Sequence, residues 1–444
     1  MKRSRLFKKQ LAHSKKLSLS FIIVLFSNTI LACAPVNHAT APVKVEIIKD
    51  NDTYQLYRGG QPYNIKGAGM EFDDMSNFVA HGGNSIRTWT SQGAQEVLDK
   101  AHANGITVSI CLEMGHERMG FDYNDEAQVA AQLEKFRAVV LKHRDHPALL
   151  TWIIGNELNH SYTVFKVYDA VNDVSKMIHK LDPNHPTTTT TSGIKADVLN
   201  EIDSRAPDLD FVSFQAYGEL DILPTFIEET GYKKPFMVTE WGAVGFWEME
   251  TTAWGAPFEM NSTDKAGNYL KGYQQKLMPV TKQLIGDYVF LWGQKQERTP
   301  TWFGLFTETG DETEAVDVMH FIWNGSWPDN RSPTFKSIIL DNKTARDDVF
   351  LTAGKIFTAT VDAEDYESDT LHYSWEIKPE SNATEVGGDF EKNIQTLSTL
   401  ITNSESSQIS FTSPAQAGAY RLFVYINDGK QKTAHGNIPF YVNK

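Results

Sequence analysis

The sequence is poor in cysteine, with only Cys33 and Cys111 among 444 residues. Two cysteines cannot build the disulfide framework that stabilises small secreted folds, so stability must come from a hydrophobic core. Hydrophobic residues make up 41% of the chain and aromatic residues 11%, which is ample for such a core. We expect Cys111, in the apolar run "VSICLEM", to be a buried small hydrophobic residue.

Basic residues are outnumbered, with 42 Lys and Arg against 56 Asp and Glu. Seven of the basic residues lie in the first 32 positions, which contain no acidic residue. The remaining 35 basic and 56 acidic residues give the rest of the chain a formal net charge of −21. This charge argues against nucleic acid and anionic lipid surfaces as partners, and it suits an uncharged substrate.

The apolar stretch near the N-terminus, "LSLSFIIVLFSNTILA", is too short and too weakly flanked for a membrane-spanning helix. It follows a basic segment, which is the pattern of an export signal. Residues 30–33, Ile-Leu-Ala-Cys, resemble a bacterial lipobox, which implies cleavage before Cys33 and lipid on its thiol. We therefore expect residues 1–33 to be a signal peptide with a lipobox, and the exported protein to meet a membrane only through this anchor. An ordinary secretory signal with an incidental cysteine is the alternative.

Short apolar runs alternate with helix-like segments over about 270 residues, after a hairpin-like start at Val43. Eight runs read as strands: residues 65–69, "NSIRTW", "ITVSICLEM", "LLTWIIGNE", "HPTTTTTSG", "DFVSFQAYG", "PFMVTEW" and "DYVFLWG". Repeated strand and helix units predict a parallel α/β fold, and eight of them favour a closed (β/α)8 TIM barrel over a doubly wound sheet. No Gly-rich phosphate loop follows the first strand, which weakens a nucleotide-binding alternative.

The pattern changes at Pro333, after which short alternating segments separated by Asp, Gly, Ser and Asn turns predict an all-β sandwich. "DAEDYESDTLHYSW" and "AGAYRLFVYINDG" resemble PKD and cadherin-like Ig-type modules. The predicted domains are therefore a barrel over residues 43–332 and a sandwich over residues 333–444. Acidic residues in this region could hold calcium, but solvated turn carboxylates are the favoured interpretation: Asp362, Glu364, Asp365 and Asp369.

Two glutamates stand at the ends of apolar runs, Glu157 in "LLTWIIGNELNH" and Glu240 in "KPFMVTEWGA". A TIM barrel gathers the C-terminal ends of its strands around one mouth, so both should face one site. Burying a carboxylate there costs free energy, so such a residue is expected to have a charged partner or a catalytic function. Paired carboxylates are the groups of glycoside hydrolysis. We assign Glu157 as acid/base and Glu240 as nucleophile, with Asn156 on the sugar 2-hydroxyl.

The two glutamates at these strand ends resemble those of the clan A glycoside hydrolases. The segments "YNIKGAGM", "GGNSIRTW", "TWIIGNELN" and "VTEWGA" are most similar to the catalytic barrel of family 2. The chain lacks the N-terminal sandwiches usual in that family, which puts a family 2 exo-glycosidase specificity in doubt. Compact lipoproteins with such a barrel and an Ig-like module also include endo-β-1,3-glucanases.

The resemblance assigns further substrate-binding residues. Arg87 matches an arginine that supports the nucleophile, and Tyr217 matches a tyrosine that hydrogen-bonds it. Gln215 stands where related families often carry His. Trp292 matches an aromatic platform beneath the sugar. Weaker candidates are Glu113, His116 and Trp241.

The sequence thus predicts a retaining β-glycosidase acting by double displacement on a neutral poly- or oligosaccharide, with no metal and no cofactor. Two alternatives stay open. A transglycosylase would use the same two glutamates but pass the sugar to an acceptor, and a surface glycan-binding lipoprotein would bind without turnover. The sugar, the linkage, endo or exo action and the oligomeric state are not predicted.

Overall fold

A computed structural model describes residues 41–71, 75–383 and 387–444. Cys33 and the rest of the predicted signal peptide lie outside the described residues. Within the described residues, no helix combines the length and the apolar character needed to cross a membrane.

Eight parallel strands close into a barrel, which confirms the predicted TIM fold. The strands follow one another around the barrel in chain order, and β11 closes on β4. Each is short, and most of their side chains are buried because helices cover the outside and packed residues fill the inside. The strands are β4 (Gly67–Gly69), β5 (Ser85–Arg87), β6 (Thr107–Leu112), β7 (Leu149–Ile154), β8 (Thr187–Ser192), β9 (Phe211–Gln215), β10 (Phe236–Trp241) and β11 (Leu284–Val289).

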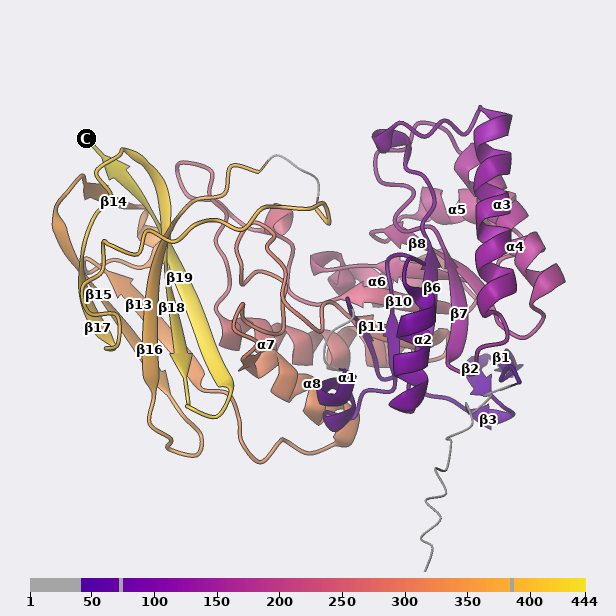
Figure 1. Cartoon of the computed structure of the whole chain (residues 1–444), viewed down its shortest axis with the longest axis horizontal. Coiled ribbons are helices and arrows are strands. Elements are labelled where there is room, and N and C mark those ends of the chain that lie inside the picture. The colour runs from indigo at the N-terminus through magenta and orange to yellow at the C-terminus, as the bar shows by residue number, and fades with distance from the viewer. Residues whose placement is uncertain (1–40, 72–74, 384–386) are drawn as a thin grey trace, which may run out of the picture. The chain divides into compact units, whose positions relative to one another are not determined.

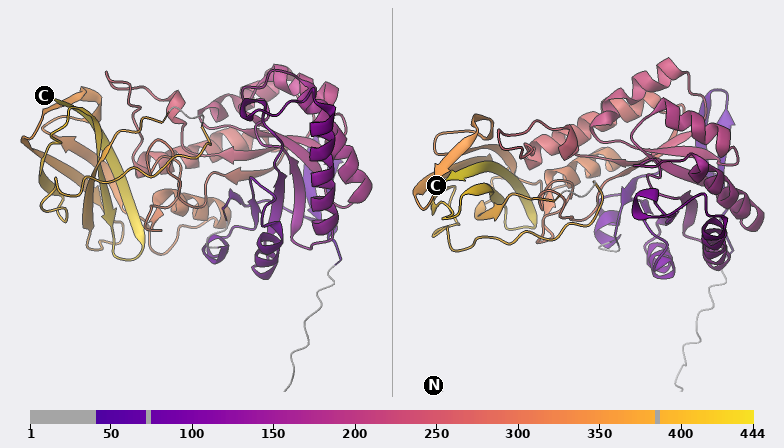
Figure 2. Two further views of the ribbon diagram at one scale, coloured as in Figure 1. Left: turned by 45° about the horizontal axis from the view of Figure 1, so that its top comes forward. Right: turned by 90° about the horizontal axis from the view of Figure 1, so that it is seen from above.

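Helices connect these strands and lie on the outside of the barrel (Figure 1, Figure 2). Asp125 caps the longest by accepting hydrogen bonds from the backbone N–H groups of Ala127 and Gln128. The helices are α1 (Met75–Ala80), α2 (Ala94–Ala103), α3 (Glu126–His143), α4 (Lys166–Leu181), α5 (Ala196–Arg205), α6 (Leu223–Thr230), α7 (Ser262–Gly272) and α8 (Glu314–Asn324). Short 3₁₀ turns cover Glu117–Met119, Gly218–Ile222, Phe246–Glu248, Met278–Val280 and Ala345–Asp347, and a π turn covers Tyr273–Leu277.

The hairpin that precedes the barrel packs against the N-terminal ends of several strands. It consists of β1 (Val45–Asp50), β2 (Thr53–Arg58) and the short β3 (Gln61–Pro62), all antiparallel. Its Val45 and Leu56 share a core cluster with barrel residues such as Leu150 and Ile285. The hairpin therefore covers the end of the barrel opposite the strand ends that carry Glu157 and Glu240.

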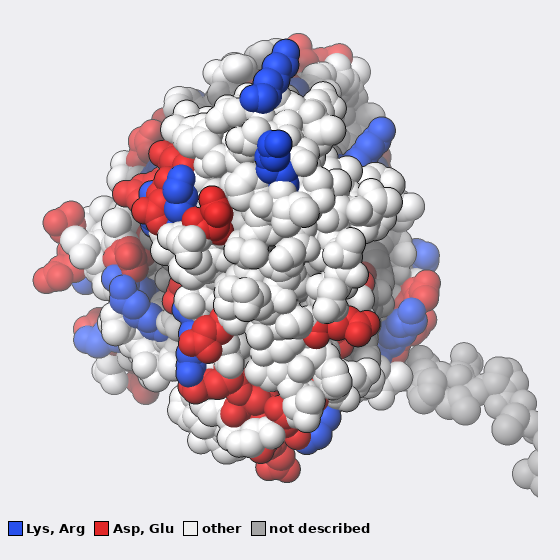
Figure 3. All heavy atoms as spheres, turned by 90° about the vertical axis from the view of Figure 1, so that its left-hand side faces the viewer, with Lys and Arg blue, Asp and Glu red and all other residues white. Residues whose placement is uncertain are grey.

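The C-terminal residues form two sheets around a second hydrophobic core, consistent with a β-sandwich. One sheet has the order β13 (Thr334–Leu340), β15 (Ile356–Glu364), β17 (Gln408–Thr412). The other has the order β12 (Glu312–Thr313), β19 (Lys432–Asn443), β18 (Gly418–Asn427), β16 (His372–Pro379), with β14 (Val349–Thr352) also paired to β19. Figure 3 shows the side of the molecule on which these sheets lie, with acidic side chains around the margins of a broad uncharged area.

Buried polar contacts join these sheets to the barrel. The strand β12 precedes the predicted boundary at residue 333 yet pairs with β19. Lys432 of β19 forms ion pairs of 2.5 Å with Glu312 and with Asp317. The Arg421 guanidinium donates to the Pro257 carbonyl oxygen at 2.9 Å. The sandwich is thus packed onto the barrel by desolvated charges, and the boundary at residue 333 stays a prediction.

Candidate active site

Glu157 and Glu240 line one cavity of about 650 Å³ at the C-terminal ends of the barrel strands. Glu157 follows β7, and Glu240 lies near the end of β10. The lining also includes Gln215 of β9, residues that follow other barrel strands, and the backbone of Gly387 and Gly388 between β16 and β17. The structure therefore brings together the two carboxylates that strand ends alone predicted.

The chain turns sharply between β7 and Glu157. Gly155 has a φ of 74° and Glu157 a φ of 50°, both in the left-handed region. A Cβ at position 155 would lie 2.4 Å from the Leu158 side chain, so only glycine fits. The N–H of Glu157 donates to Thr190 Oγ1 at 2.9 Å, which holds this conformation. Backbone strain of this kind is often found where a side chain is held for function.

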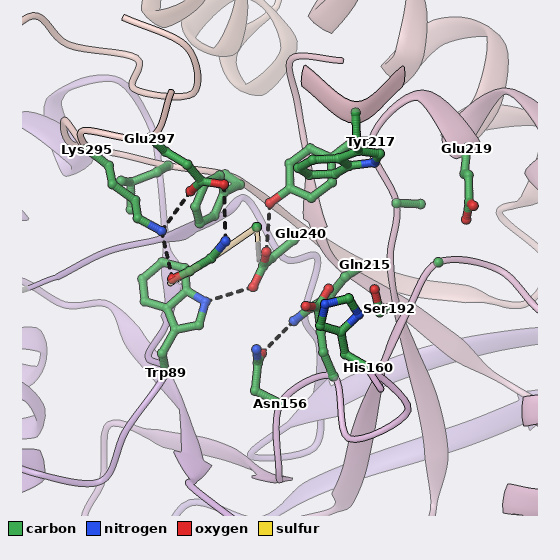
Figure 4. A pocket seen from close by; sticks show the side chains of 18 of the residues that line it. Trp89, Asn156, His160, Ser192, Gln215, Tyr217, Glu219, Glu240, Lys295 and Glu297 are labelled. Atoms are coloured by element: carbon green, nitrogen blue, oxygen red, sulfur yellow. Dashed lines mark hydrogen bonds and ion pairs between the residues drawn. The ribbon is translucent and has the colours of Figure 1, made fainter. Parts of the chain in front are cut away.

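Three donors surround the carboxylate of Glu240, and Figure 4 shows two of them, Trp89 and Tyr217. Arg87 Nη1 lies 2.5 Å from Oε1, and Trp89 Nε1 donates to the same oxygen at 2.7 Å. Tyr217 donates its hydroxyl to Oε2 at 2.8 Å. Arg87 is fully buried, and the Glu240 side chain is 8% exposed. These donors hold a negative charge on Glu240 and orient it toward the cavity.

Glu157 has a different electrostatic environment. Burial and then the charge of Glu240 raise the pKa of Glu157 to about 8, against the opposing effect of Arg87. Glu297, a third carboxylate of the cavity, raises it further. Glu157 thus favours its protonated form at neutral pH, beside a Glu240 carboxylate that is ion-paired with Arg87. Two acids with environments that separate their protonation states are the arrangement expected for a proton donor and a nucleophile.

Asn156 is fixed in one orientation between these groups. Its Oδ1 accepts from Arg87 Nη2 at 3.0 Å and from Gln215 Nε2 at 2.7 Å. Because the oxygen is occupied, the amide nitrogen is the group available to donate to a ligand. Gln215, predicted to stand where related families often carry histidine, thus positions Asn156.

The comparisons with known proteins agree with this geometry. Residues 72–337 match the family model "Glycosyl hydrolases family 2, TIM barrel domain". The chain belongs to this family. A stretch of 110 residues is 28% identical to mannan endo-1,4-β-mannosidase F of Aspergillus clavatus, covering 21% of this chain and 25% of that protein.

Two solved structures share the fold of this family 2 chain. One is β-glucuronidase 2 of Bacteroides uniformis, 14% identical with a TM-score of 0.50, covering 90% of this chain and 48% of that one. The other is the β-glucuronidase of Ruminococcus gnavus, 15% identical with a TM-score of 0.50, covering 64% of this chain and 53% of that one. The family 2 chain thus spans a quarter of the curated relative and about half of each structural neighbour.

Two predicted binding residues of this family 2 barrel do not reach the cavity. Trp292 is 3% exposed and stacks on Trp323 of α8, with its Nε1 donating to Asn77 Oδ1 at 3.1 Å. The prediction of a Trp292 platform is wrong because β11 ends at Val289, and Phe290 directly after it lines the cavity.

Trp241 is likewise absent from the cavity lining. It is fully buried, and its Nε1 donates to Asp287 Oδ1 at 2.9 Å. Adjacent strand residues point to opposite faces, so Trp241 points away from the cavity that its neighbour Glu240 faces. Its assignment as a binding residue is therefore also wrong.

Several lining residues escaped sequence reasoning. Trp89 belongs to the run "NSIRTW" and stands two residues after Arg87 near the same strand end, which is the signal that could have identified it. Most of the other missed residues lie on loops or 3₁₀ turns, where no periodic pattern marks them. Among them are Lys195, Trp247, Lys295, Glu297, Gly387 and Gly388. The weaker candidates Glu113 and His116 do line the cavity.

The acidic turn of the C-terminal sheets already has protein partners. Asp369 pairs with Lys430 at 2.7 Å, and Glu364 pairs with Lys336 at 2.5 Å. Asp365 Oδ1 accepts from the backbone N–H groups of Glu367 and Asp369. Carboxylate oxygens of residues 365, 367 and 369 lie within 4.8 Å of one another. These contacts are typical of turn carboxylates, but Asp365 Oδ2 is buried without a hydrogen-bond partner, so calcium stays the less favoured interpretation of this turn.

Proposed function

We propose that this chain is a retaining β-glycoside hydrolase of neutral poly- or oligosaccharides. The observation that carries this proposal is the contrast inside one cavity between Glu240, which accepts three hydrogen bonds, and Glu157, whose pKa is raised to about 8. Such a pair supplies an ionised nucleophile and a proton donor at the same pH.

The reaction follows from these two states. Glu157 gives its proton to the glycosidic oxygen as the bond to the anomeric carbon breaks, while Glu240 attacks that carbon and forms a glycosyl ester. Glu157, now ionised, then takes a proton from water as the water attacks the same carbon and releases Glu240. Asn156 donates to the 2-hydroxyl throughout. Two displacements restore the original anomeric configuration.

The lining of the cavity supports an uncharged sugar. It carries seven carboxylates but only two lysines, so an anionic sugar would meet repulsion. The residues are Glu71, Glu113, Glu157, Glu219, Glu240, Glu248 and Glu297, against Lys195 and Lys295. Aromatic rings of Trp89, Trp247 and Phe290 offer flat surfaces for the apolar faces of a sugar. The first neutral substrates to test are β-1,3-glucan, which endo-β-1,3-glucanases of similar architecture cleave, and β-mannan, the polymer named for the curated relative.

The test is a screen of β-glucans, β-mannan and aryl β-glycosides for release of reducing ends or phenol. Release that disappears in Glu240→Ala supports the proposal. Binding without release from every substrate would instead favour the surface glycan-binding protein. Products longer than the substrate, formed at high substrate concentration, would identify a transglycosylase.

We also propose that the protein is exported and anchored by lipid at Cys33, and that its C-terminal sandwich is of the PKD or Ig-like type. The support for the anchor is the lipobox-like "ILAC" after the apolar stretch. A mature N-terminus at Cys33 and release of the protein by Cys33→Ser would support it. A mature N-terminus downstream of Cys33 would contradict it.

A further inference from the structure

A short segment of the C-terminal sheets, residues 387–389, contributes to the catalytic cavity of the barrel. Gly387 and Gly388 line the cavity together with both catalytic glutamates. This segment lies between β16 and β17, far from the barrel in sequence. A sandwich that served only as a spacer would have no reason to enter the substrate site.

Hydrogen bonds fix the segment to barrel loops. Asp389 forms a bidentate ion pair with Arg118, with N–O distances of 2.8 and 2.9 Å. The N–H of Gly388 donates to Glu297 Oε1 at 3.1 Å, and its carbonyl oxygen accepts from Lys295 at 3.0 Å. Bidentate arginine–carboxylate pairs are among the more strongly oriented contacts in proteins.

Both glycines are required by the path of this segment. A Cβ on Gly387 would lie 2.9 Å from the ring of Trp247, and Gly388 has a φ of 91°. The backbone can therefore pass directly over Trp247, which lines the cavity and packs against Tyr217 at a ring distance of 5.8 Å. Tyr217 in turn donates to Glu240. The segment is thus connected to Glu240 through two side chains, Trp247 and Tyr217.

Glu297 is the polar group that this segment holds in the cavity. Its side chain is 4% exposed, and its oxygens accept from Gly388 N–H and, at 2.8 Å, from Lys295. A carboxylate has further lone pairs that can accept from sugar hydroxyls. Figure 4 shows Glu297 and Lys295 on the same side of the cavity as Tyr217 and Trp89.

We propose that residues 387–389 form one wall of the sugar-binding cavity and, through Glu297 and Arg118, determine which neutral glycans it accepts. A sugar unit beyond the scissile bond lies against Trp247, with its hydroxyls on Glu297. This inference rests on the proposed glycosidase function, and it makes the C-terminal sandwich a part of the substrate site.

The test compares full-length Asp389→Ala with Glu364→Ala, which breaks a surface ion pair of the same sandwich with Lys336. On a neutral oligosaccharide we expect Asp389→Ala to lower kcat/KM by about tenfold or more, mainly by raising KM. An aryl glycoside has no sugar unit that contacts residues 387–389. On this substrate kcat/KM of Asp389→Ala should fall by less than about threefold. Glu364→Ala should match the wild type on both substrates.

A pH profile separates this role from a merely structural one. The groups that act on Glu157 are Glu240, Arg87, Glu297, Ser192 and Arg118. In Asp389→Ala the positive charge of Arg118 is no longer neutralised, so it lowers the pKa of Glu157. The alkaline limb of the kcat/KM profile should therefore move to lower pH. Glu297→Gln removes a negative charge and should move it in the same direction. If Asp389→Ala does not fold, Glu297→Gln carries the test with the same oligosaccharide loss.

Equal behaviour of Asp389→Ala and Glu364→Ala on both substrates would overturn the proposal. An oligosaccharide that is bound but not cleaved by the wild type would contradict the proposed function alone. The wall is then tested by oligosaccharide affinity, which Asp389→Ala should weaken by about tenfold. Absence of both binding and turnover by the wild type would overturn both proposals.

Discussion

Two buried glutamates of this protein differ because of their partners. The side chain of Glu259, at the junction of barrel and sandwich, is fully buried and accepts from Lys265, Thr299, Thr301 and Asn437 at 2.5 to 2.8 Å. Burial alone would raise the pKa of Glu259, but the charges of Lys265 and Arg421 lower it to about 2.

The environment of Glu157 in the cavity is the opposite. Burial and the charge of Glu240 raise its pKa to about 8, and among the described residues no cation forms an ion pair with it. The comparison teaches that burial does not by itself set the charge of a carboxylate, because the partners decide it. A fully partnered glutamate joins two parts of the fold, whereas a buried glutamate beside a second carboxylate is held ready to give up a proton.

The largest effect is expected at Glu240, on activity. Glu240→Ala should lower kcat by at least about 10³-fold on every substrate, because no other group at this position can form the glycosyl ester. The variant also leaves Arg87 buried without its counter-charge, so its unfolding midpoint should fall, and activity is measured below that midpoint. Activity of the purified variant within tenfold of the wild type would contradict the role of Glu240.

Glu157→Ala should have a substrate-dependent effect. A natural glycoside needs the proton of Glu157, so its cleavage should fall by about 10²- to 10⁴-fold. A dinitrophenyl glycoside needs no proton, so its first phenol equivalent should appear in a burst, followed by slow turnover. Stopped-flow absorbance measures both phases. Equal loss on both substrates would show that the acid/base role is misassigned.

At the junction the effect should fall on stability. Glu259→Ala leaves Lys265 buried without its counter-charge, which should lower the free energy of unfolding by about 3–5 kcal/mol. Glu364→Gln, at an exposed ion pair, is the matched control and should cost less than about 1 kcal/mol. Chemical denaturation measures both, and equal costs would contradict the account of the junction.

The two glutamates should also give opposite pH dependences of stability. The raised pKa of Glu157 means that its contribution is present below its ordinary value of 4.5 and is lost as pH rises through about 8. The lowered pKa of Glu259 means that its contribution is present above 4.5 and is lost as pH falls toward 2. Glu157→Gln should therefore flatten the decline of Tm between pH 5 and 8. An unchanged decline would argue against the raised pKa.

Much of this site could be predicted because strand ends converge in a barrel. The order of the apolar runs predicted that Glu157, with Asn156, and Glu240 share one mouth of the barrel, and the family resemblance added Arg87 and Tyr217. The errors at Trp241 and Trp292 came from the limits and faces of single strands, where one or two residues reverse a side chain. Glu297 and residues 387–389 lie on loops, whose position depends on tertiary contacts that no local pattern encodes.

The central claim is that Glu240 attacks and Glu157 donates, and trapping of the covalent intermediate tests it most directly. A 2-deoxy-2-fluoro β-glycoside of the cleaved sugar, with a dinitrophenyl leaving group, slows hydrolysis of the glycosyl ester enough to isolate it. Mass spectrometry of the digested protein should find one sugar, attached to the peptide that contains Glu240. A label on Glu157, or turnover with inversion and no label, would contradict the account.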